Sequence, residues 1–314
     1  MAALLALLFP GQASQAVGMG TDLVAESTEA RRLFDAADSL TGLPITRLCA
    51  EGPLERLTQT DVAQPAVVVT SLAALTVLRS ALPNEFGAVA GHSVGEYAAY
   101  VAADVFDVET ALRLVHIRAQ AMAAACQSVD GSMAAIIGLD EAPLREACSV
   151  ASQNGSSVEL ANLNAPGNLI VSGERGAIDR LGALAREAGA RRVLPLNVGG
   201  PFHSTYMRPA AEALRTVLDD LTLRPGRIPV VVNATAEATQ EPDALRRELA
   251  AQVYSPVRWI ESLRTLARLG CDRFLEIGPG SVLAGLVRRT LPDAKVASFG
   301  SMCDLPAARA LVMG

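Results

Sequence analysis

The segment from Gly91 to Gly95 has the composition and spacing of a serine-nucleophile turn. It reads Gly91-His92-Ser93-Val94-Gly95, and it lies between a short apolar run over 86–90 and an Ala-rich, helix-prone run over 94–103. In a GxSxG turn between a strand and a helix, the glycines permit a sharp bend that exposes the serine hydroxyl. The N–H of Val94 would begin the helix and point toward a developing oxyanion. This context favours Ser93 as a nucleophile over a merely structural turn of small residues.

A serine nucleophile needs a general base, and the chain contains three histidines. His92 adjoins Ser93 on the bend, where neighbouring side chains diverge, so we expect it to be packed or hydrogen-bonded. His116 lies in an apolar-periodic helix and is expected to be a satisfied helix histidine. His203 lies in a loop between a strand and a helix, which is where catalytic groups are usually presented. Elimination and context therefore predict His203 as the base.

The groups that would support this pair are less distinct. No Asp or Glu stands in a distinctive loop between Ser93 and His203, and a backbone carbonyl could orient the imidazole equally well. The loop over 10–15 could add a second oxyanion donor or be a plain strand–helix connection. Arg118 lies on an otherwise apolar helix and needs an anionic partner, because an unpaired buried charge is costly. Its position alone leaves open whether that partner is a ligand or an internal salt bridge.

Strands and helices are predicted to alternate through most of the chain that carries these residues. Expected strands cover 4–9, 86–90, 229–233 and 274–277, and expected helices cover 22–40, 64–82, 94–103, 108–125, 204–221, 242–252, 257–269 and 282–291. The helix over 64–82 is expected to begin near Pro65, because proline suits the first turn. Alternation of this kind indicates a mostly parallel sheet that is covered on both faces.

The middle of the chain has a different pattern. Strands over 132–139, 158–162, 169–173 and 192–198, with helices over 141–153 and 178–189, give the order β-α-β-β-α-β. This order is typical of the ferredoxin-like, split βαβ arrangement. We therefore predict an α/β fold with a large subdomain over 1–128 and 199–314 and an inserted small subdomain over 129–198.

Composition argues against several classes of protein. Half of the 314 residues are hydrophobic and 19% are charged, which supplies a sizeable core and is unlike a disordered chain. The net charge of −6 argues against binding nucleic acid or an anionic membrane. The five cysteines form no ligand cluster, so no metal site is expected, and their odd number fits reduced thiols in the cytoplasm. No run of 18 apolar residues suggests a membrane span, and the apolar start is interpreted as a buried strand rather than a signal peptide.

Seven motifs together resemble those of the malonyl-CoA:acyl carrier protein transacylases of fatty-acid synthesis and the related acyltransferases of polyketide synthases. They occur in the family's order across essentially the whole chain. The motifs are Phe9-Pro10-Gly11-Gln12, Gly91-His92-Ser93-Val94-Gly95-Glu96, Arg118, Asn162-Leu163-Asn164, Pro201-Phe202-His203-Ser204, Gln252-Val253-Tyr254-Ser255-Pro256-Val257 and Glu276-Ile277-Gly278-Pro279-Gly280. The resemblance implies an α/β-hydrolase-like large subdomain with a ferredoxin-like insert.

The resemblance also implies a role for each matched position. Ser93 would attack the malonyl thioester, and His203 would deprotonate Ser93 and protonate the leaving thiol. The backbone N–H groups of Gln12 and Val94 would form the oxyanion hole. Arg118 would pair with the free malonyl carboxylate, and its presence distinguishes the chain from relatives that handle uncharged acyl groups.

Three further positions complete the implied site. The backbone carbonyl of Gln252 would orient the base in place of a triad acid. Asn162 would line the cleft from the small subdomain. Phe202 resembles the malonyl-selecting form of the family, in which a bulky ring leaves little room for an α-methyl group; one methyl is worth about 1–3 kcal/mol of discrimination.

Two residues depart from the family pattern. Ala13 stands where the family more often has glycine, and its Cβ disfavours a positive φ beside the oxyanion loop. Pro201 stands where small residues such as alanine are common in malonyl-selective members. Both changes leave the chemistry intact and bear on which acyl group is preferred.

The implied reaction passes malonyl from CoA to a serine ester and then to the phosphopantetheine thiol of an acyl carrier protein, without a permanently bound cofactor. The implied protein is a cytoplasmic monomer whose partners are malonyl-CoA and the carrier, with no nucleic acid or membrane. Three alternatives remain: an acyl-thioester hydrolase, the malonyl-loading subunit of malonate decarboxylase, and a non-catalytic scaffold. The pathway is open between fatty-acid and polyketide synthesis.

Overall fold

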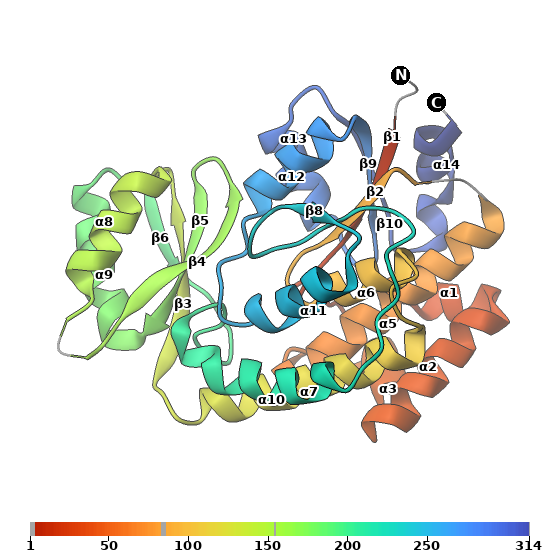
Figure 1. Ribbon diagram of the computed structural model, residues 1–314, viewed down its shortest axis with the longest axis horizontal. Coiled ribbons are helices and arrows are strands. Elements are labelled where there is room, and N and C mark those ends of the chain that lie inside the picture. Colours follow the sequence, from red (N-terminus) through yellow and green to blue (C-terminus); the bar gives the residue numbers. More distant parts are fainter. Residues whose placement is uncertain (1–3, 83–85, 154, 314) are drawn as a thin grey trace.

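The computed structural model describes residues 4–82, 86–153 and 155–313, and Figure 1 shows how their elements are arranged. The main sheet has six strands in the order β10-β9-β1-β2-β7-β8. Neighbouring strands are parallel except β7 and β8, which are antiparallel. The strands are β1 (Leu4–Phe9), β2 (Ala88–Gly91), β7 (Val230–Val231), β8 (Ala238–Thr239), β9 (Cys271–Ile277) and β10 (Lys295–Phe299).

Helices cover both faces of this sheet. They are α1 (Thr21–Glu26), α2 (Thr28–Thr41), α3 (Ile45–Glu51), α4 (Leu54–Leu57), α5 (Thr60–Ala81), α6 (Gly95–Ala102), α7 (Val108–Cys126), α10 (Arg208–Asp219), α11 (Pro242–Ala251), α12 (Trp259–Arg268), α13 (Val282–Thr290) and α14 (Leu305–Met313). Alternate side chains of β1 enter different cores: Leu5, Leu7 and Phe9 pack on the side of α5–α7. Ala6 and Leu8 pack on the side of α12 and α13. Burial on both faces accounts for the unbroken apolar sequence of β1.

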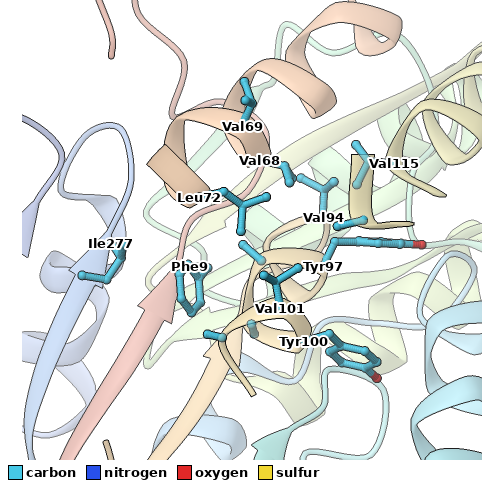
Figure 2. Packing of buried hydrophobic residues seen from close by; sticks show 14 of the residues in the cluster. Phe9, Val68, Val69, Leu72, Val94, Tyr97, Tyr100, Val101, Val115 and Ile277 are labelled. Atoms are coloured by element: carbon cyan, nitrogen blue, oxygen red, sulfur yellow. The ribbon is translucent and has the colours of Figure 1, made fainter. Parts of the chain in front are cut away.

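The helix that follows the serine turn is held firmly by apolar packing. In Figure 2, Val68 and Leu72 of α5 face Val94 and Tyr97 at the start of α6, with Phe9 of β1 beside them. All five side chains are almost completely buried. Because each fully buried side chain of this size contributes about 1.5–3 kcal/mol, the position of α6 relative to β1 is strongly fixed.

Helix α5 is long and apolar enough to cross a membrane, but its environment is that of a core helix. Of its most apolar 18-residue window, 89% is buried inside the protein. Helix α5 packs against α2, α6 and α7 and is the central helix on its face of the sheet.

A second sheet forms a separate layer at one end of the molecule (Figure 1). Its four strands are antiparallel in the order β4-β5-β3-β6. The elements are β3 (Gly131–Ile137), α8 (Glu141–Ala151), β4 (Val158–Ala165), β5 (Asn168–Glu174), α9 (Arg175–Glu187) and β6 (Arg192–Pro195). Strand β4 is also tied to the main body, because Leu163 N–H donates to Val257 O at 2.9 Å and Val257 N–H donates to Ala161 O at 2.8 Å.

Two helix predictions differ from the structure. The helix expected over 22–40 is divided at Ser27, whose backbone is extended and whose Oγ caps α2 by accepting from Ala30 N–H. The prediction that α5 begins near Pro65 was wrong. The helix begins at Thr60, and Asp61 lies in its favourable first turn, paired with Arg56. Pro65 lies inside α5, where proline removes one backbone hydrogen bond.

Candidate active site

The serine turn has the geometry that exposes a nucleophile. Strand β2 ends at Gly91, α6 begins at Gly95, and Ser93 between them has a φ of +53°. A Cβ on Gly91 would lie 2.0 Å from the backbone carbon of Gly95, and a Cβ on Gly95 would lie 2.2 Å from Phe9 O. Both glycines are therefore required for the close approach of β1, β2 and α6. A serine held at positive φ is strained, and such strain concentrates at functional sites.

Asn233, just beyond β7, braces this strained turn. Ser93 N–H donates to Asn233 Oδ1 at 2.6 Å, and Asn233 Nδ2 donates to Gly91 O at 2.6 Å. Asn233 was not among the residues predicted for the site. Its position at the carboxyl end of a predicted strand was the available signal, because ligand and catalytic groups gather at that edge of a parallel sheet.

His203 is in hydrogen-bond contact with Ser93, 110 positions earlier in the chain. His203 Nε2 lies 2.7 Å from Ser93 Oγ. On the other side of the ring, Nδ1 lies 2.8 Å from the backbone oxygen of Gln252 and 3.2 Å from that of Ser255. Carbonyl oxygens only accept, so Nδ1 carries the hydrogen and Nε2 presents its lone pair to the serine hydroxyl.

The imidazole is held in its neutral, basic form. His203 is 4% exposed, and burial together with the positive charge of Arg118 lowers its pKa from 6.5 to about 3. The carbonyls of Gln252 and Ser255 act in the opposite direction, because they favour the protonated ring. They would stabilise an imidazolium formed during reaction.

Arg118 is buried beside the serine with no carboxylate partner. It is 2% exposed, and no ion pair involves it among the described residues. One terminal nitrogen donates to Ser93 Oγ at 3.1 Å and to Gln252 Oε1 at 2.9 Å, and the other donates to Gln64 Oε1 at 2.5 Å. Its buried Nε has no hydrogen-bond partner in the described part of the chain. The guanidinium therefore keeps donor capacity for an anion, with only neutral groups holding it in place.

Two backbone N–H groups are available near the hydroxyl. Val94 precedes the first residue of α6, and Gln12 lies in the loop after β1. Within the described ranges, neither N–H donates to a protein acceptor, although the neighbouring Ala13 N–H is bonded to Gln15 Oε1. Ala13 adopts a φ of +79°, so this alanine accepts the left-handed conformation that its Cβ disfavours.

A cavity of about 360 Å³ lies over these groups, between the main sheet and the four-stranded sheet. Of the residues predicted for the site, the cavity wall includes Gln12, Ser93, Arg118, Asn162, Phe202 and His203. Asn162 reaches it from β4 and Phe202 from the loop that carries His203; each is 6% exposed. The structure thus brings these predicted side chains to one place.

The other two histidines lie outside the reacting pair. His92 Nε2 bonds Asn164 Oδ1 at 2.9 Å and its ring packs edge-on against Trp259, as expected for a packed residue. The prediction that His116 is satisfied was wrong for Nδ1, which is buried without a partner among the described residues. Nor does any group of three or more His, Cys, Asp or Glu side chains that could hold a metal ion occur among the residues that the structure describes.

Known sequences are similar to this chain over nearly its whole length. Residues 6–305 match the acyl transferase domain family. A malonyl CoA-acyl carrier protein transacylase of Bacillus subtilis (strain 168) is 42% identical over 286 residues, covering 91% of this chain and 90% of that protein. The protein of the same name from Escherichia coli (strain K12) is 38% identical over 303 residues, covering 96% of this chain and 98% of that protein.

Solved structures give the same result. An acyl carrier protein S-malonyltransferase from Vibrio cholerae matches with a TM-score of 0.93 and 38% identity, covering 98% of this chain and 100% of that one. A malonyl-transacylase in complex with its type II polyketide synthase acyl-carrier protein matches with a TM-score of 0.94 and 37% identity, covering 98% and 99%. With this similarity over its full length, the chain belongs to the malonyl-CoA:acyl carrier protein transacylase family.

Proposed function

We propose that this protein transfers a malonyl group from malonyl-CoA to the phosphopantetheine thiol of an acyl carrier protein, through an ester on Ser93. The observation that carries the proposal is that one hydroxyl contacts both a neutral base and an anion-binding cation. Ser93 Oγ lies 2.7 Å from His203 Nε2 and 3.1 Å from the Arg118 guanidinium. The names of the relatives, which are malonyl transacylases, support the same reaction.

In the first half-reaction, Ser93 Oγ attacks the thioester carbonyl while its proton passes to His203 Nε2. The Gln252 carbonyl that accepts from Nδ1–H steadies the imidazolium that forms. The free N–H groups of Gln12 and Val94 are the donors available to the oxyanion. When the tetrahedral intermediate collapses, the carbon–sulfur bond breaks and the CoA thiolate takes the proton from His203.

The second half-reaction reverses these steps with a new thiol. The phosphopantetheine thiol gives its proton to His203 as its sulfur attacks the malonyl ester. The ester bond then breaks, and Ser93 Oγ recovers the proton from the imidazolium. No redox change occurs, so the transfer itself needs no permanently bound cofactor.

Arg118 gives the site its selectivity in this proposal. Acetyl and malonyl thioesters differ by one carboxylate, and a buried guanidinium held by neutral groups gains a charge-assisted partner only from malonyl. Phe202, in the wall of the same cavity, limits the room beside the α-carbon. Its ring supports a preference for malonyl over methylmalonyl.

The two sheets support a matching division of the chain. We propose that 1–128 and 199–314 form an α/β-hydrolase-like large subdomain and 129–198 a ferredoxin-like small subdomain. The antiparallel order β4-β5-β3-β6, with two helices in the intervening connections, supports the second assignment. We further propose that the protein is a monomer, because all of the protein groups at the site come from one chain. A cytoplasmic location is supported by the five cysteines, which are all free thiols.

The lifetime of the acyl-enzyme tests transfer against hydrolysis. Mixed with malonyl-CoA alone, the protein is expected to acquire a malonyl adduct that persists, measured as intact mass over time. Addition of the carrier protein bearing phosphopantetheine should discharge the adduct far faster than water does. The same carrier without phosphopantetheine is the control and should leave the adduct intact. Discharge by water at the rate seen with the thiol would instead make the protein a thioester hydrolase.

The pH dependence of acylation follows from the lowered pKa of His203. The reactive form is the neutral ring, so a pKa of about 3 keeps it available well below neutral pH. We expect kcat/KM for acetyl-CoA to change less than about twofold between pH 7.5 and 5.5, whereas an unshifted imidazole would give about a tenfold fall. In Arg118→Ala, loss of the nearby charge raises the pKa of His203, and the acid limb should move to higher pH. A tenfold fall in kcat/KM over this pH range in the protein without substitutions would contradict the lowered pKa of His203.

A further inference from the structure

Glu96 is a fully buried carboxyl group that the reaction described above does not use. It lies on α6, three residues after Ser93, and its exposed fraction is 0%. Its Oε1 accepts from Asn233 N–H at 2.7 Å, and its Oε2 accepts from Gln252 Nε2 at 2.6 Å. Both neighbours are donors, so the carboxylate, which only accepts, satisfies both.

The side-chain amide of Gln252 links Glu96 to Arg118 by hydrogen bonds. Its Nε2 donates to Glu96 Oε2 and to Ser93 O at 3.1 Å, which leaves Oε1 to face the Arg118 guanidinium at 2.9 Å. Asn233, Glu96, Gln252 and Arg118 thus form a row of hydrogen bonds, which begins with a backbone donor at Asn233 and ends with a guanidinium donor at Arg118. Both ends are fixed as donors, because neither a peptide N–H nor a guanidinium can accept.

A row with donors at both ends can be fully bonded only if one member is acceptor-only. With glutamate at 96, every contact pairs a donor with an acceptor. With glutamine at 96, one of its ends becomes a donor. Either that donor faces Asn233 N–H, or Gln252 must turn its amide over and present its NH₂ to Arg118. Each arrangement contains one donor–donor contact.

We propose that Glu96 is a positioning residue that fixes the Gln252 side-chain amide with its oxygen toward Arg118, and so sets the orientation of the carboxylate-binding guanidinium. This rests on the proposed function for the role of Arg118 and adds the device that holds it. The same arrangement places a carboxylate near the buried guanidinium. Glu96 lies one amide away from Arg118, and each charge favours the ionised form of the other.

Burial and hydrogen bonding act on the Glu96 carboxyl group in opposite directions, and the hydrogen-bond geometry is what supports the ionised form. Burial, with the Glu248 carboxylate as second cause, raises the pKa of Glu96 well above its usual value. The hydrogen bonds from Asn233 and Gln252 and the charge of Arg118 oppose that rise. A neutral acid would also place a hydroxyl between two donors. The geometry therefore accommodates the carboxylate.

The first experiment compares Glu96→Gln with the unmodified protein, using malonyl-CoA and acetyl-CoA separately. We expect the ratio of the two kcat/KM values to fall about tenfold, through a higher KM for malonyl-CoA, because one hydrogen bond to a charged group is lost. Acetyl transfer should change much less, since the bond from His203 to the Gln252 backbone is unaffected. An equal loss with both substrates would overturn the proposal, because it would indicate general loosening of the serine turn.

Glu276→Gln is the matched control. Glu276 is also a fully buried glutamate, and it accepts from the backbone N–H groups of Leu283 and Ala284. The substitution imposes the same donor conflict at a position that does not touch Gln252. We expect it to lower the free energy of unfolding without changing the malonyl-to-acetyl ratio; a shift in the ratio equal to that of Glu96→Gln would contradict the proposal.

A double-mutant cycle separates this inference from the proposed function. Without Arg118, one fixed donor is gone, and Gln252 can turn its amide over while losing only the 3.1 Å bond from Nε2 to Ser93 O. Glu96→Gln should therefore cost less unfolding free energy in the Arg118→Ala background than in the unmodified protein. If Glu96→Gln folds only in that background, the proposal is also supported. Equal destabilisation in both backgrounds, or failure to fold in both, overturns it. Should Arg118→Ala leave the ratio unchanged while the coupling persists, the proposed carboxylate-binding role fails and the positioning role stands.

Discussion

Ser93→Ala is expected to abolish the malonyl adduct and to lower transfer by about 10⁴-fold or more, the usual loss when a nucleophile is removed. Alanine keeps the Cβ that already tolerates φ of +53° and removes only the atom that contacts His203 and Arg118. The variant should therefore fold. Intact-protein mass after incubation with malonyl-CoA is the measurement, with thermal unfolding as the check on structure.

Ser149→Ala provides the comparison for this loss. Ser149 is exposed on α8, away from the cavity, and its replacement should leave both the adduct and the rate unchanged. A Ser93→Ala protein that still acquires the malonyl mass would exclude Ser93 as the nucleophile.

Arg118→Ala is expected to reverse the order of acyl preference. Loss of a charge-assisted pair in a buried site costs about 3 kcal/mol, so malonyl transfer should fall at least about 100-fold. Acetyl transfer should fall far less, because acetyl gains nothing from the guanidinium. Competition between malonyl-CoA and acetyl-CoA for the serine, followed by mass, measures the ratio. Adding methylmalonyl-CoA to the competition tests the limit set by Phe202.

Two variants on the same helix show whether charge or geometry matters. Arg118→Lys keeps the charge and loses the planar fork, so it should fall between alanine and arginine. Arg113→Ala removes an exposed arginine that pairs with Glu109, and it should not change selectivity. A preference for malonyl that survives in Arg118→Ala would remove the carboxylate-binding role.

Local sequence was sufficient to propose Ser93 and His203, which the structure places in contact, and insufficient to find the groups that hold them. Ser93 sits in a turn whose glycines and flanking elements are visible within a dozen residues, and His203 follows from a short census of histidines. Glu96, Asn233 and Gln64 gain their meaning from partners that lie far along the chain: 137 positions separate Glu96 from Asn233, and 54 separate Gln64 from Arg118. No periodicity encodes such pairs. The adjacency of β2 and β7 in the sheet creates the first pair, and the packing of α5 against α7 creates the second.

Helices and strands were predictable where their buried residues leave a clear pattern in the sequence. They were not predictable where the residues are only partly buried. β1 was placed well because its residues from Leu5 to Phe9 are all buried, and α7 because its buried residues recur at helical spacing. Three elements were not predicted: β10 and α14 near the end of the chain, and the two-residue strand β8. β10 is an edge strand whose Lys295 is exposed and whose next three residues are half-buried, so it shows no run of buried positions. The start of α5 was wrongly predicted at Pro65, because the stability of this helix comes from packing, which outweighs the loss of one backbone hydrogen bond at the proline.

The tie between β4 and Val257 has a consequence for how such enzymes can diversify. The bonds that join them run between backbone atoms, so substitution by any residue other than proline can preserve them. On one side of these bonds, Val257 follows the segment whose carbonyl oxygens contact His203. On the other side, the bonded residues of β4 flank Asn162, which lines the cavity wall. Substitutions that reshape this wall therefore need not displace His203, so the proposed acyl selectivity can change over evolution while the contact between Ser93 and His203 is retained.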